Sequence, residues 1–273
     1  MSSRYSTSAS GGRGTISPVA REIVAFGREL QAQGAAQVGA AFTDSPEANG
    51  LIEDSPEAFL LGMLFTQGIP AERAWAGPYL LRARLGHLSL ARLAEEPDAV
   101  RAAVQAPPML HRFKNTIPRW ISSAARKLLE EYGGDASRIW APGSHVLEVT
   151  ERLSAFDGVG RKKAVMAVEI LQRHFGVGLV GREFGAVAYD VHVRRVFLRS
   201  GLVEHDTVAE VETAAACACP ESPGTVDLAA WLIGRETCRP KAPRCGDCRL
   251  GGVCPRLTWL VVDGVGARDG RRA

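Results

Sequence analysis

Four cysteines close to the C-terminus form the pattern best suited to inorganic chemistry in this 273-residue chain. They are Cys238, Cys245, Cys248 and Cys254, in the segment CRPKAPRCGDCRLGGVC. Four thiolates so close together can surround one metal centre, and sulfur ligands select zinc or an iron–sulfur cluster. Structural zinc sites tend to use two C-x2-C-like turns, whereas this segment has one such turn and two longer, unequal loops. The spacing departs from this zinc pattern, and an iron–sulfur cluster, zinc and four ordinary thiols are the alternatives.

A short basic segment, Gly158-Val-Gly-Arg-Lys162, is the second candidate for chemistry. A helix is expected to end near Phe156, the two glycines make a tight bend, and a new helix starts at Arg161. Glycines let a backbone approach another molecule closely, and free N–H groups at a helix start can bind a phosphate oxygen. The pattern predicts a helix–hairpin–helix element that binds the DNA backbone without reading bases. Taken alone, it also fits a plain turn between two helices.

Together these motifs resemble the endonuclease III family of helix–hairpin–helix DNA glycosylases. The resemblance lies in GVGRK at 158–162, Asp-Val-His at 190–192, WLIGRETC at 231–238, LFTQ at 64–67 and the cysteine segment, and it covers roughly residues 56–254. It implies an all-α, two-lobed helix–hairpin–helix glycosylase fold, with a helical barrel lobe and an iron–sulfur cluster lobe. It also implies a [4Fe-4S] cluster held by the four cysteines.

The same resemblance implies the catalytic residues. Lys162 corresponds to the family's nucleophile, and Asp190 to its carboxylate. A neutral lysine amine can attack the anomeric carbon of a flipped-out nucleotide, displace the base and remain as a Schiff base, which permits strand cleavage by β-elimination. A carboxylate near the sugar stabilises the developing positive charge. The implied function is base-excision repair: a DNA glycosylase with AP lyase activity that removes a damaged or modified, by family default pyrimidine, base.

Other interpretations of these residues stay open. Asp190 could only cap the helix that follows it, and Lys162 could only contact a phosphate. The protein could be a monofunctional glycosylase in which Asp190 activates water. It could also be a non-catalytic DNA-binding or redox-sensing iron–sulfur protein, or a structural homologue that binds zinc.

Double-stranded DNA with a damaged or modified base or an abasic site is the expected partner of a monomeric protein. Gln67 matches the family residue that enters the gap left by the flipped base, and Leu110 or His111 is a candidate wedge between stacked bases. Arg249, like the other cations of the cysteine segment, is expected to face phosphates. The expected DNA-binding residues are Gln67, Leu110, His111, Gly158, Gly160, Arg161, Lys163, His192, Arg239, Lys241 and Arg244.

Three features depart from the family pattern. The stretch between Lys162 and Asp190 is longer than usual, and its glycine-rich residues 176–185 are expected to form a loop or short hairpin near the cleft. Lys163 stands where small hydroxyl residues are common, and residues 107–114 lack the expected glycine-led loop. Cys217 and Cys219 lie outside the cysteine segment and are expected to be small buried thiols on an alanine-rich helix.

Composition sets further limits. The net charge of +3 permits a nucleic-acid partner without requiring one. No apolar run is long enough to span a membrane, and the Ser/Gly-rich N-terminus lacks the apolar core of a secretory signal. Six cysteines without an export signal indicate a reducing compartment and metal ligation rather than disulfides. We therefore expect a cytoplasmic, nucleoid-associated protein without membrane contact.

Helical patterns must position these residues. Helices are expected at 18–33, 71–85, 89–95, 97–104, 117–132 and 145–153, and a helix start at 54–57 precedes an apolar run at 58–65. The expected organisation is a disordered leader (1–18), a helical barrel lobe with the hairpin (51–180), an iron–sulfur lobe (19–50 and 181–258) and a flexible tail (259–273). The active site would then lie between the lobes.

Overall fold

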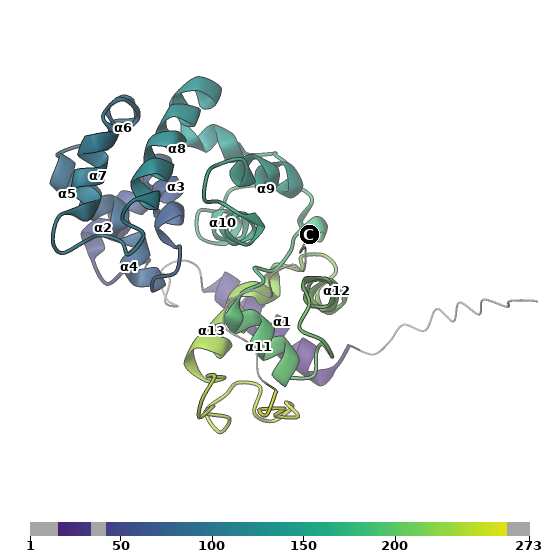
Figure 1. Cartoon of the computed structure of the whole chain (residues 1–273). Helices are drawn as coiled ribbons and strands as arrows, with labels where there is room; N and C mark the ends of the chain where they lie inside the picture. The colour runs from purple at the N-terminus through teal and green to yellow at the C-terminus, as the bar shows by residue number, and fades with distance from the viewer. Residues whose placement is uncertain (1–15, 34–41, 261–273) are drawn as a thin grey trace, which may run out of the picture.

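The computed structural model describes residues 16–33 and 42–260, which fold almost entirely into helices and their connections (Figure 1). Within these residues no strand forms, and the β-type pairing is one isolated bridge between His145 and Val180. The expected all-α fold is confirmed. The described helices include none with the length and apolar character needed to cross a membrane. Apart from residues 16–18 and 259–260, the expected leader and tail lie outside the described residues.

A first hydrophobic cluster is built by helices α2 to α10. They are α2 (Pro46–Asp54), α3 (Pro56–Phe65), α4 (Ala71–Trp75), α5 (Gly77–Leu85), α6 (Leu90–Glu95), α7 (Pro97–Gln105), α8 (Thr116–Tyr132), α9 (Val146–Ser154) and α10 (Arg161–Arg173), with the 3-10 turn η1 (Ala136–Trp140) before α9. Helix α3 lies at the centre, because every residue from Ala58 to Phe65 is buried. A helix that is apolar on all sides is stable only when neighbours surround it.

The start of α3 follows the expected chemistry. The hydroxyl of Ser55 accepts a hydrogen bond from the amide of Ala58 at 3.1 Å, and Pro56 occupies the first helical position. Gly62 then allows α4 to approach, because a Cβ there would lie 2.4 Å from the indole ring of Trp75. The helix ends at Phe65, so that Thr66 and Gln67 leave the core at the edge of the first cluster.

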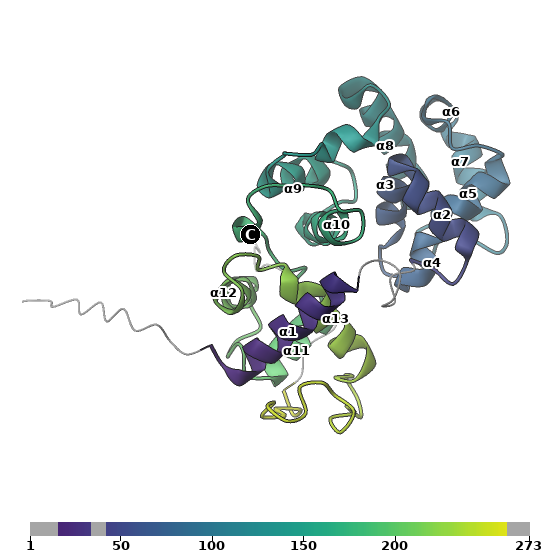
Figure 2. The same cartoon turned by 180° about the vertical axis from the view of Figure 1, so that it is seen from behind.

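A second hydrophobic cluster combines the first helix with the C-terminal part of the chain. It contains α1 (Pro18–Ala32), α11 (Val191–Arg199), α12 (Val208–Ala218) and α13 (Thr225–Glu236). Figures 1 and 2 show α1 lying along α13 although the two are almost two hundred residues apart in sequence. Gly27 permits this crossing, since a Cβ there would lie 2.1 Å from the carbonyl oxygen of Thr225.

Three features differ from the sequence-based expectations. The helix expected at 71–85 is two helices, because Pro78 lacks an amide N–H and starts a new helix after Ala76. Helix α2 and the turn η1 are not expected from the sequence. Residues 42–50, expected in the iron–sulfur lobe, instead pack on the first cluster through Phe42 and α2. We therefore propose that the barrel lobe begins near residue 42 rather than 51.

Candidate active site and cysteine cluster

A cleft of about 980 Å3 lies between the two hydrophobic clusters. Helices α10, α11 and α13 and the turn after α3 contribute its walls. Aromatic and apolar side chains line much of it, which is typical of small-molecule pockets. The polar side chains that face it include Gln67, Lys162, Lys163, Glu169, Arg173, Asp190, His192 and Asp227, and also Asp44, Glu72, Arg161, His174 and Arg235. Of these, Glu169, Arg173 and Asp227 are not identified by any sequence motif.

The expected hairpin forms between α9 and α10. Gly158 adopts a positive φ of 81°, and a Cβ there would lie 2.4 Å from the indole of Trp120, so that both conformation and space require glycine. Gly160 is the N-cap of α10, is exposed, and would leave a Cβ free of neighbours within 4 Å. Among the described residues no side chain caps α10. The start of α10 is therefore open to an anion from solvent.

The side chains of Lys162 and Asp190 meet at the mouth of the cleft. Lys162 is the second residue of α10, and its Nζ lies 4.0 Å from Oδ2 of Asp190. The lysine side chain is 53% exposed, whereas that of Asp190 is only 11% exposed. Lys162 can therefore reach an incoming molecule while the carboxylate stays in a fixed position.

Asp190 is fixed because it is the N-cap of α11. Its Oδ1 accepts hydrogen bonds from the amides of His192 at 2.8 Å and Val193 at 2.9 Å. The other oxygen, Oδ2, faces Lys162. The capping role and the position beside the lysine, considered as alternatives from the sequence, coexist because they use different oxygens.

Lys163 does not take the expected position at the DNA surface. It is 7% exposed, its Nζ donates to the carbonyl oxygen of Leu64 at 3.2 Å, and it lies 5.4 Å from the ring centre of Trp120. Burial, reinforced by the charge of Lys162, lowers the pKa of Lys163 to about 8. The prediction of a phosphate contact is wrong for Lys163 in this conformation, because one helical step turns its side chain from the cleft mouth toward the end of α3.

Leu110 and His111 are also buried rather than available as a wedge, so this prediction is wrong as well. Leu110 is 5% exposed and belongs to the first cluster. His111 is fully buried; its Nδ1 accepts from the amide of Phe113 at 3.0 Å, so its Nε2 donates to the carbonyl oxygen of Phe65 at 3.1 Å. Met109 and Phe113 beside them are 45% and 38% exposed. Nothing in the sequence distinguishes these two apolar side chains from Leu110.

The remaining residues of the cleft and hairpin are accessible to different degrees. Gln67 is exposed at the edge of the cleft, next to Phe113, which would lie 3.3 Å from a Cβ on Gly68. His192 is half-buried, and its ring packs edge-on against Trp231 at 5.9 Å between centres. Arg161 is exposed but forms an ion pair with Glu212 of α12 at 2.7 Å. A phosphate must therefore compete with a carboxylate for Arg161.

The glycine-rich residues 176–185 lie against α9 rather than in the cleft. Val180 pairs with His145, and the turn η2 (Arg182–Phe184) places Phe184 5.4 Å from the imidazole of His145. None of these ten residues lines the cleft. The segment nevertheless reaches the vicinity of the cleft, as expected, because a Cβ on Gly185 would lie 3.7 Å from Oε1 of Glu169. Outside both sites, Cys219 is buried as expected, but Cys217 is exposed on α12.

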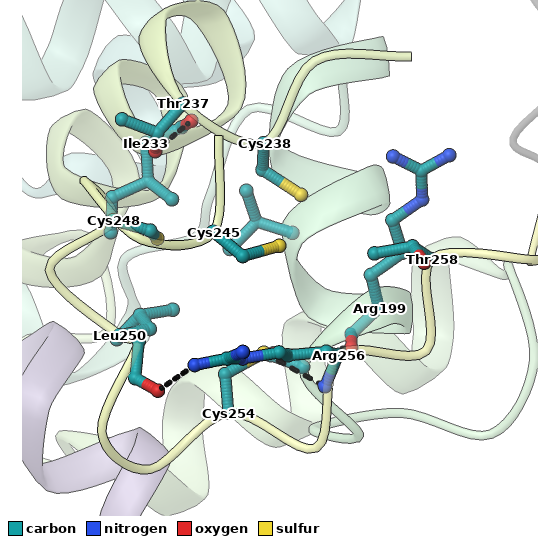
Figure 3. Close-up of a pocket in the computed structure, with 13 residues that line it drawn as sticks. Arg199, Ile233, Thr237, Cys238, Cys245, Cys248, Leu250, Cys254, Arg256 and Thr258 are labelled. Atoms are coloured by element: carbon teal, nitrogen blue, oxygen red, sulfur yellow. Dashed lines mark hydrogen bonds between the residues drawn. The ribbon is translucent and has the colours of Figure 1, made fainter. Parts of the chain in front are cut away.

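The four cysteines of the C-terminal segment face one small pocket at the end of α13 (Figure 3). Each is half-buried, and Val196, Ile233 and Leu250 complete the apolar lining. The sulfur of Cys254 accepts a hydrogen bond from the amide of Arg256 at 3.3 Å. In the part of the chain that the structure describes, no group of three or more His, Cys, Asp or Glu side chains is arranged to hold a single metal ion. An all-sulfur donor set in an apolar pocket with an N–H···S contact fits a sulfur-ligated cluster.

Two arginines of α11 donate hydrogen bonds to backbone carbonyl groups in and after this segment, and they were not identified from the sequence. Arg195 donates to the carbonyl oxygen of Cys238 at 2.6 Å, and Arg199 donates to those of Arg239 at 2.8 Å and Leu260 at 3.0 Å. They lie four residues apart on one face of the helix. The four-residue spacing predicts that both arginines share one face of α11, but it does not show that backbone carbonyl groups lie beside that face.

The cations of the cysteine segment divide into two groups. Arg239, Lys241 and Arg244 are exposed, and only Arg244 among these three has an acidic neighbour in the described structure, with its Nη1 3.9 Å from Asp247 Oδ2. Arg249 instead pairs with two carboxylates of α1, Glu22 at 2.8 Å and Glu29 at 2.7 Å between Nη1 and Oε2. The expectation that Arg249 faces phosphates is wrong, because these two acids already neutralise and fix it.

Comparison with known proteins confirms the resemblance to endonuclease III. The chain is 32% identical over 136 residues to Endonuclease III of Haemophilus influenzae, which covers 49% of this chain and 54% of that protein. It is 28% identical over 182 residues to Endonuclease III-like protein 1 of Gallus gallus, covering 64% of this chain and 56% of that protein. The chain thus spans about half the length of the curated relatives it matches. No family model matches it.

Solved structures show the same fold. A non-covalent endonuclease III–DNA complex aligns with a TM-score of 0.61 at 18% identity, over 88% of this chain and 97% of that one. A trapped endonuclease III–DNA covalent intermediate gives 0.57 at 20% identity, over 78% and 93%. A thermostable thymine-DNA glycosylase gives 0.57 at 14% identity, over 88% and 98%. The expected helix–hairpin–helix glycosylase fold is confirmed by these alignments.

Proposed function

We propose that this protein is a base-excision repair enzyme, a DNA glycosylase with AP lyase activity that uses Lys162 as its nucleophile. The observation that carries the proposal is the approach of the accessible Lys162 amine to the fixed carboxylate of Asp190, 4.0 Å apart beside a large cleft. The neighbouring hairpin offers an uncapped helix start for a phosphate. The similarity to endonuclease III supports the same reaction class.

The proposed reaction requires the target nucleotide to leave the base stack and enter the cleft. Neutral Lys162 Nζ forms a bond to the anomeric carbon, the bond from that carbon to the base breaks, and the base departs with the electron pair and takes up a proton. Asp190 Oδ2 stabilises the positive charge that develops on the sugar and receives the proton that the lysine nitrogen loses. The nitrogen lone pair then expels O4′, which takes up a proton, so that the sugar ring opens and an iminium forms at C1′. The iminium acidifies the C2′ hydrogen, and loss of this proton breaks the C3′–O bond and releases the 3′-phosphate.

DNA binding in this proposal combines an open helix end with exposed cations. Backbone N–H groups at the start of α10 bind one phosphate, and Arg239, Lys241 and Arg244 bind others. Gln67 at the cleft edge enters the space that the flipped base leaves. Met109 and Phe113, the accessible apolar side chains nearby, take the place of Leu110 and His111 as wedge residues.

The four cysteines would hold a [4Fe-4S] cluster in this proposal, and the cluster would order the loop that presents Arg239, Lys241 and Arg244. Its role would be structural, since thiolate ligation would fix the positions of these four loop residues. The protein would act as a monomer on damaged or abasic duplex DNA in the cytoplasm, where the nucleoid lies.

Borohydride trapping on a duplex with one abasic site tests this function. Wild type should form a covalent adduct, Lys162→Ala should form none, and Lys127→Ala, a lysine paired with Glu131 on α8, should match wild type. An adduct that persists in Lys162→Ala but disappears in Lys163→Met would show that Lys163, and not Lys162, is the nucleophile. Base release without any adduct would indicate a monofunctional enzyme, and DNA binding without either reaction a non-catalytic protein.

A further inference from the structure

The interior of the cleft contains charged side chains that the reaction at Lys162 does not use. Glu169 and Arg173 belong to α10, and Asp227 belongs to α13. Both carboxyl residues are 8% exposed, yet both line the cleft. Buried charges are costly unless a partner satisfies them. Their presence beside an accessible volume indicates that their partner enters from the cleft.

The polar atoms of these residues are only partly satisfied within the protein. Asp227 Oδ1 accepts from the amide of Ala188 at 2.6 Å, and Glu169 Oε1 accepts a long hydrogen bond from Gln172 at 3.4 Å. Among the described residues, no hydrogen bond reaches the second oxygen of either carboxyl, and no ion pair joins Arg173 to them. One oxygen of each carboxyl group and the N–H groups of Arg173 are therefore available to another molecule.

The carboxyl group of Glu169 packs closely against Gly224, and this contact does not use its oxygens in a hydrogen bond. A Cβ on Gly224 would lie 2.0 Å from Glu169 Oε1, so that only glycine at the start of α13 permits the carboxyl to occupy this position. Burial, with the charge of Asp227 as a further cause, raises the pKa of Glu169 to about 8. Burial also raises the pKa of Asp227 to about 7. The charge of Arg173 favours ionisation of both carboxyls, but it offsets only part of the effect of burial.

Glu169 and Arg173 follow Lys162 along the side of α10 that lines the cleft. Lys162, Glu169 and Arg173 all line the cleft and lie on one face of the helix. Seven residues separate Lys162 from Glu169, which corresponds to about 10 Å along the helix axis. When the anomeric carbon lies at Lys162, the base extends inward and its hydrogen-bonding edge arrives near Glu169, Arg173 and Asp227.

We propose that Glu169, Asp227 and Arg173 recognise the edge of the flipped base, and that they select bases with a ring N–H beside a carbonyl oxygen. The inference rests on the proposed function and adds its specificity. The ionised carboxyl accepts the ring N–H, a hydrogen bond that itself favours ionisation, and the guanidinium donates to the carbonyl oxygen. Bases of the uracil and guanine type present this pair, whereas cytosine and adenine types present a bare ring nitrogen beside an amino group. The latter would place acceptor against acceptor and donor against donor.

Matched base pairs test the proposal on the full chain. Single-turnover excision is measured on duplexes with 5-hydroxyuracil or 5-hydroxycytosine, and with hypoxanthine or adenine. In at least one pair, wild type should prefer the base with a ring N–H beside a carbonyl oxygen, which is 5-hydroxyuracil or hypoxanthine, by tenfold or more. Glu169→Gln and Asp227→Asn should reduce this preference by about tenfold to a hundredfold, because an amide can turn its NH2 group toward a bare ring nitrogen. The exposed Glu183→Gln should leave it unchanged.

Cleavage of an abasic site separates base recognition from the reaction itself, because the abasic substrate has no base. Glu169→Gln should cleave abasic DNA within about twofold of wild type. An unchanged base preference in both variants would overturn the proposal. The proposal would also be overturned if wild type cleaved abasic DNA but removed neither 5-hydroxyuracil nor hypoxanthine. An equal loss of abasic cleavage in Glu169→Gln would assign it a structural role and also overturn it. Failure of wild type to cleave abasic DNA would instead refute the proposed function.

Discussion

Asp190 serves two purposes that substitution can separate. As the N-cap of α11 it accepts two backbone hydrogen bonds through Oδ1, and through Oδ2 it lies 4.0 Å from Lys162 Nζ. Asparagine caps helices about as well as aspartate, whereas alanine costs about 1 kcal/mol. The ion pair contributes at most about 1 kcal/mol, because half of the Lys162 side chain faces solvent. Asp190→Asn and Asp190→Ala both lose the ion pair, so the difference between them isolates the cap.

The expected result follows from this separation. In urea denaturation, Asp190→Ala should be less stable than Asp190→Asn by about 1 kcal/mol. In single-turnover base excision, both should be slower than wild type by about a hundredfold or more, because neither carries the negative charge near the sugar. Asp135 provides the control, since its carboxylate caps η1 away from the cleft with a hydrogen bond from Ser137 at 2.9 Å. Asp135→Ala should lose comparable stability and retain the full rate.

The reasoning would be refuted if activity followed stability. A rate for Asp190→Asn close to wild type, together with a slow Asp190→Ala, would mean that Asp190 acts only by fixing the start of α11. Lys162 would then need another carboxylate to assist it, and the proposed proton transfer to Oδ2 would be wrong.

Two further predictions concern buried groups. Because the pKa of Lys163 falls from 10.5 to about 8 in the folded protein, the unfolded chain binds an additional proton between these pH values. The free energy of unfolding of wild type should therefore rise by about 3 kcal/mol relative to Lys163→Met between pH 7 and pH 11, measured by urea denaturation; parallel pH profiles would contradict this. For the cysteine pocket, wild type should contain about four iron atoms per chain, and Cys245→Ser should lose them and bind DNA more weakly. Cys217→Ser, an exposed cysteine outside the segment, should retain both properties; a wild type that binds zinc instead would refute the cluster.

The hairpin and the cysteine segment are predictable because their roles depend on local chemistry. A glycine pair before a helix start requires only the backbone conformations that its own residues permit, and Gly158 indeed adopts a positive φ. Helix starts such as Ser55-Pro56 are equally local, since the capping hydroxyl and its amide partner lie three residues apart. The same applies to Asp190, whose capping bonds reach only to residues 192 and 193.

Accessibility is decided by the tertiary structure. Leu110 and Met109 are neighbours of similar hydrophobicity, but only packing into the first hydrophobic cluster determines which of them is buried. Lys162 and Lys163 are identical in type, and a rotation of about 100° along the helix directs one toward Asp190 and the other toward Leu64. Arg249 is likewise indistinguishable in sequence from its neighbours until α1 supplies Glu22 and Glu29.

The sequence by itself therefore determined the helical fold class and the hairpin, because each depends on contacts within a few residues, whereas Lys162 and Asp190 were identified through the resemblance to endonuclease III. Only the tertiary structure brought Glu169, Arg173 and Asp227 together inside one cleft. The two carboxyl residues are 58 positions apart and belong to helices of different hydrophobic clusters. Their proximity results from the packing of those clusters, and no local pattern encodes it.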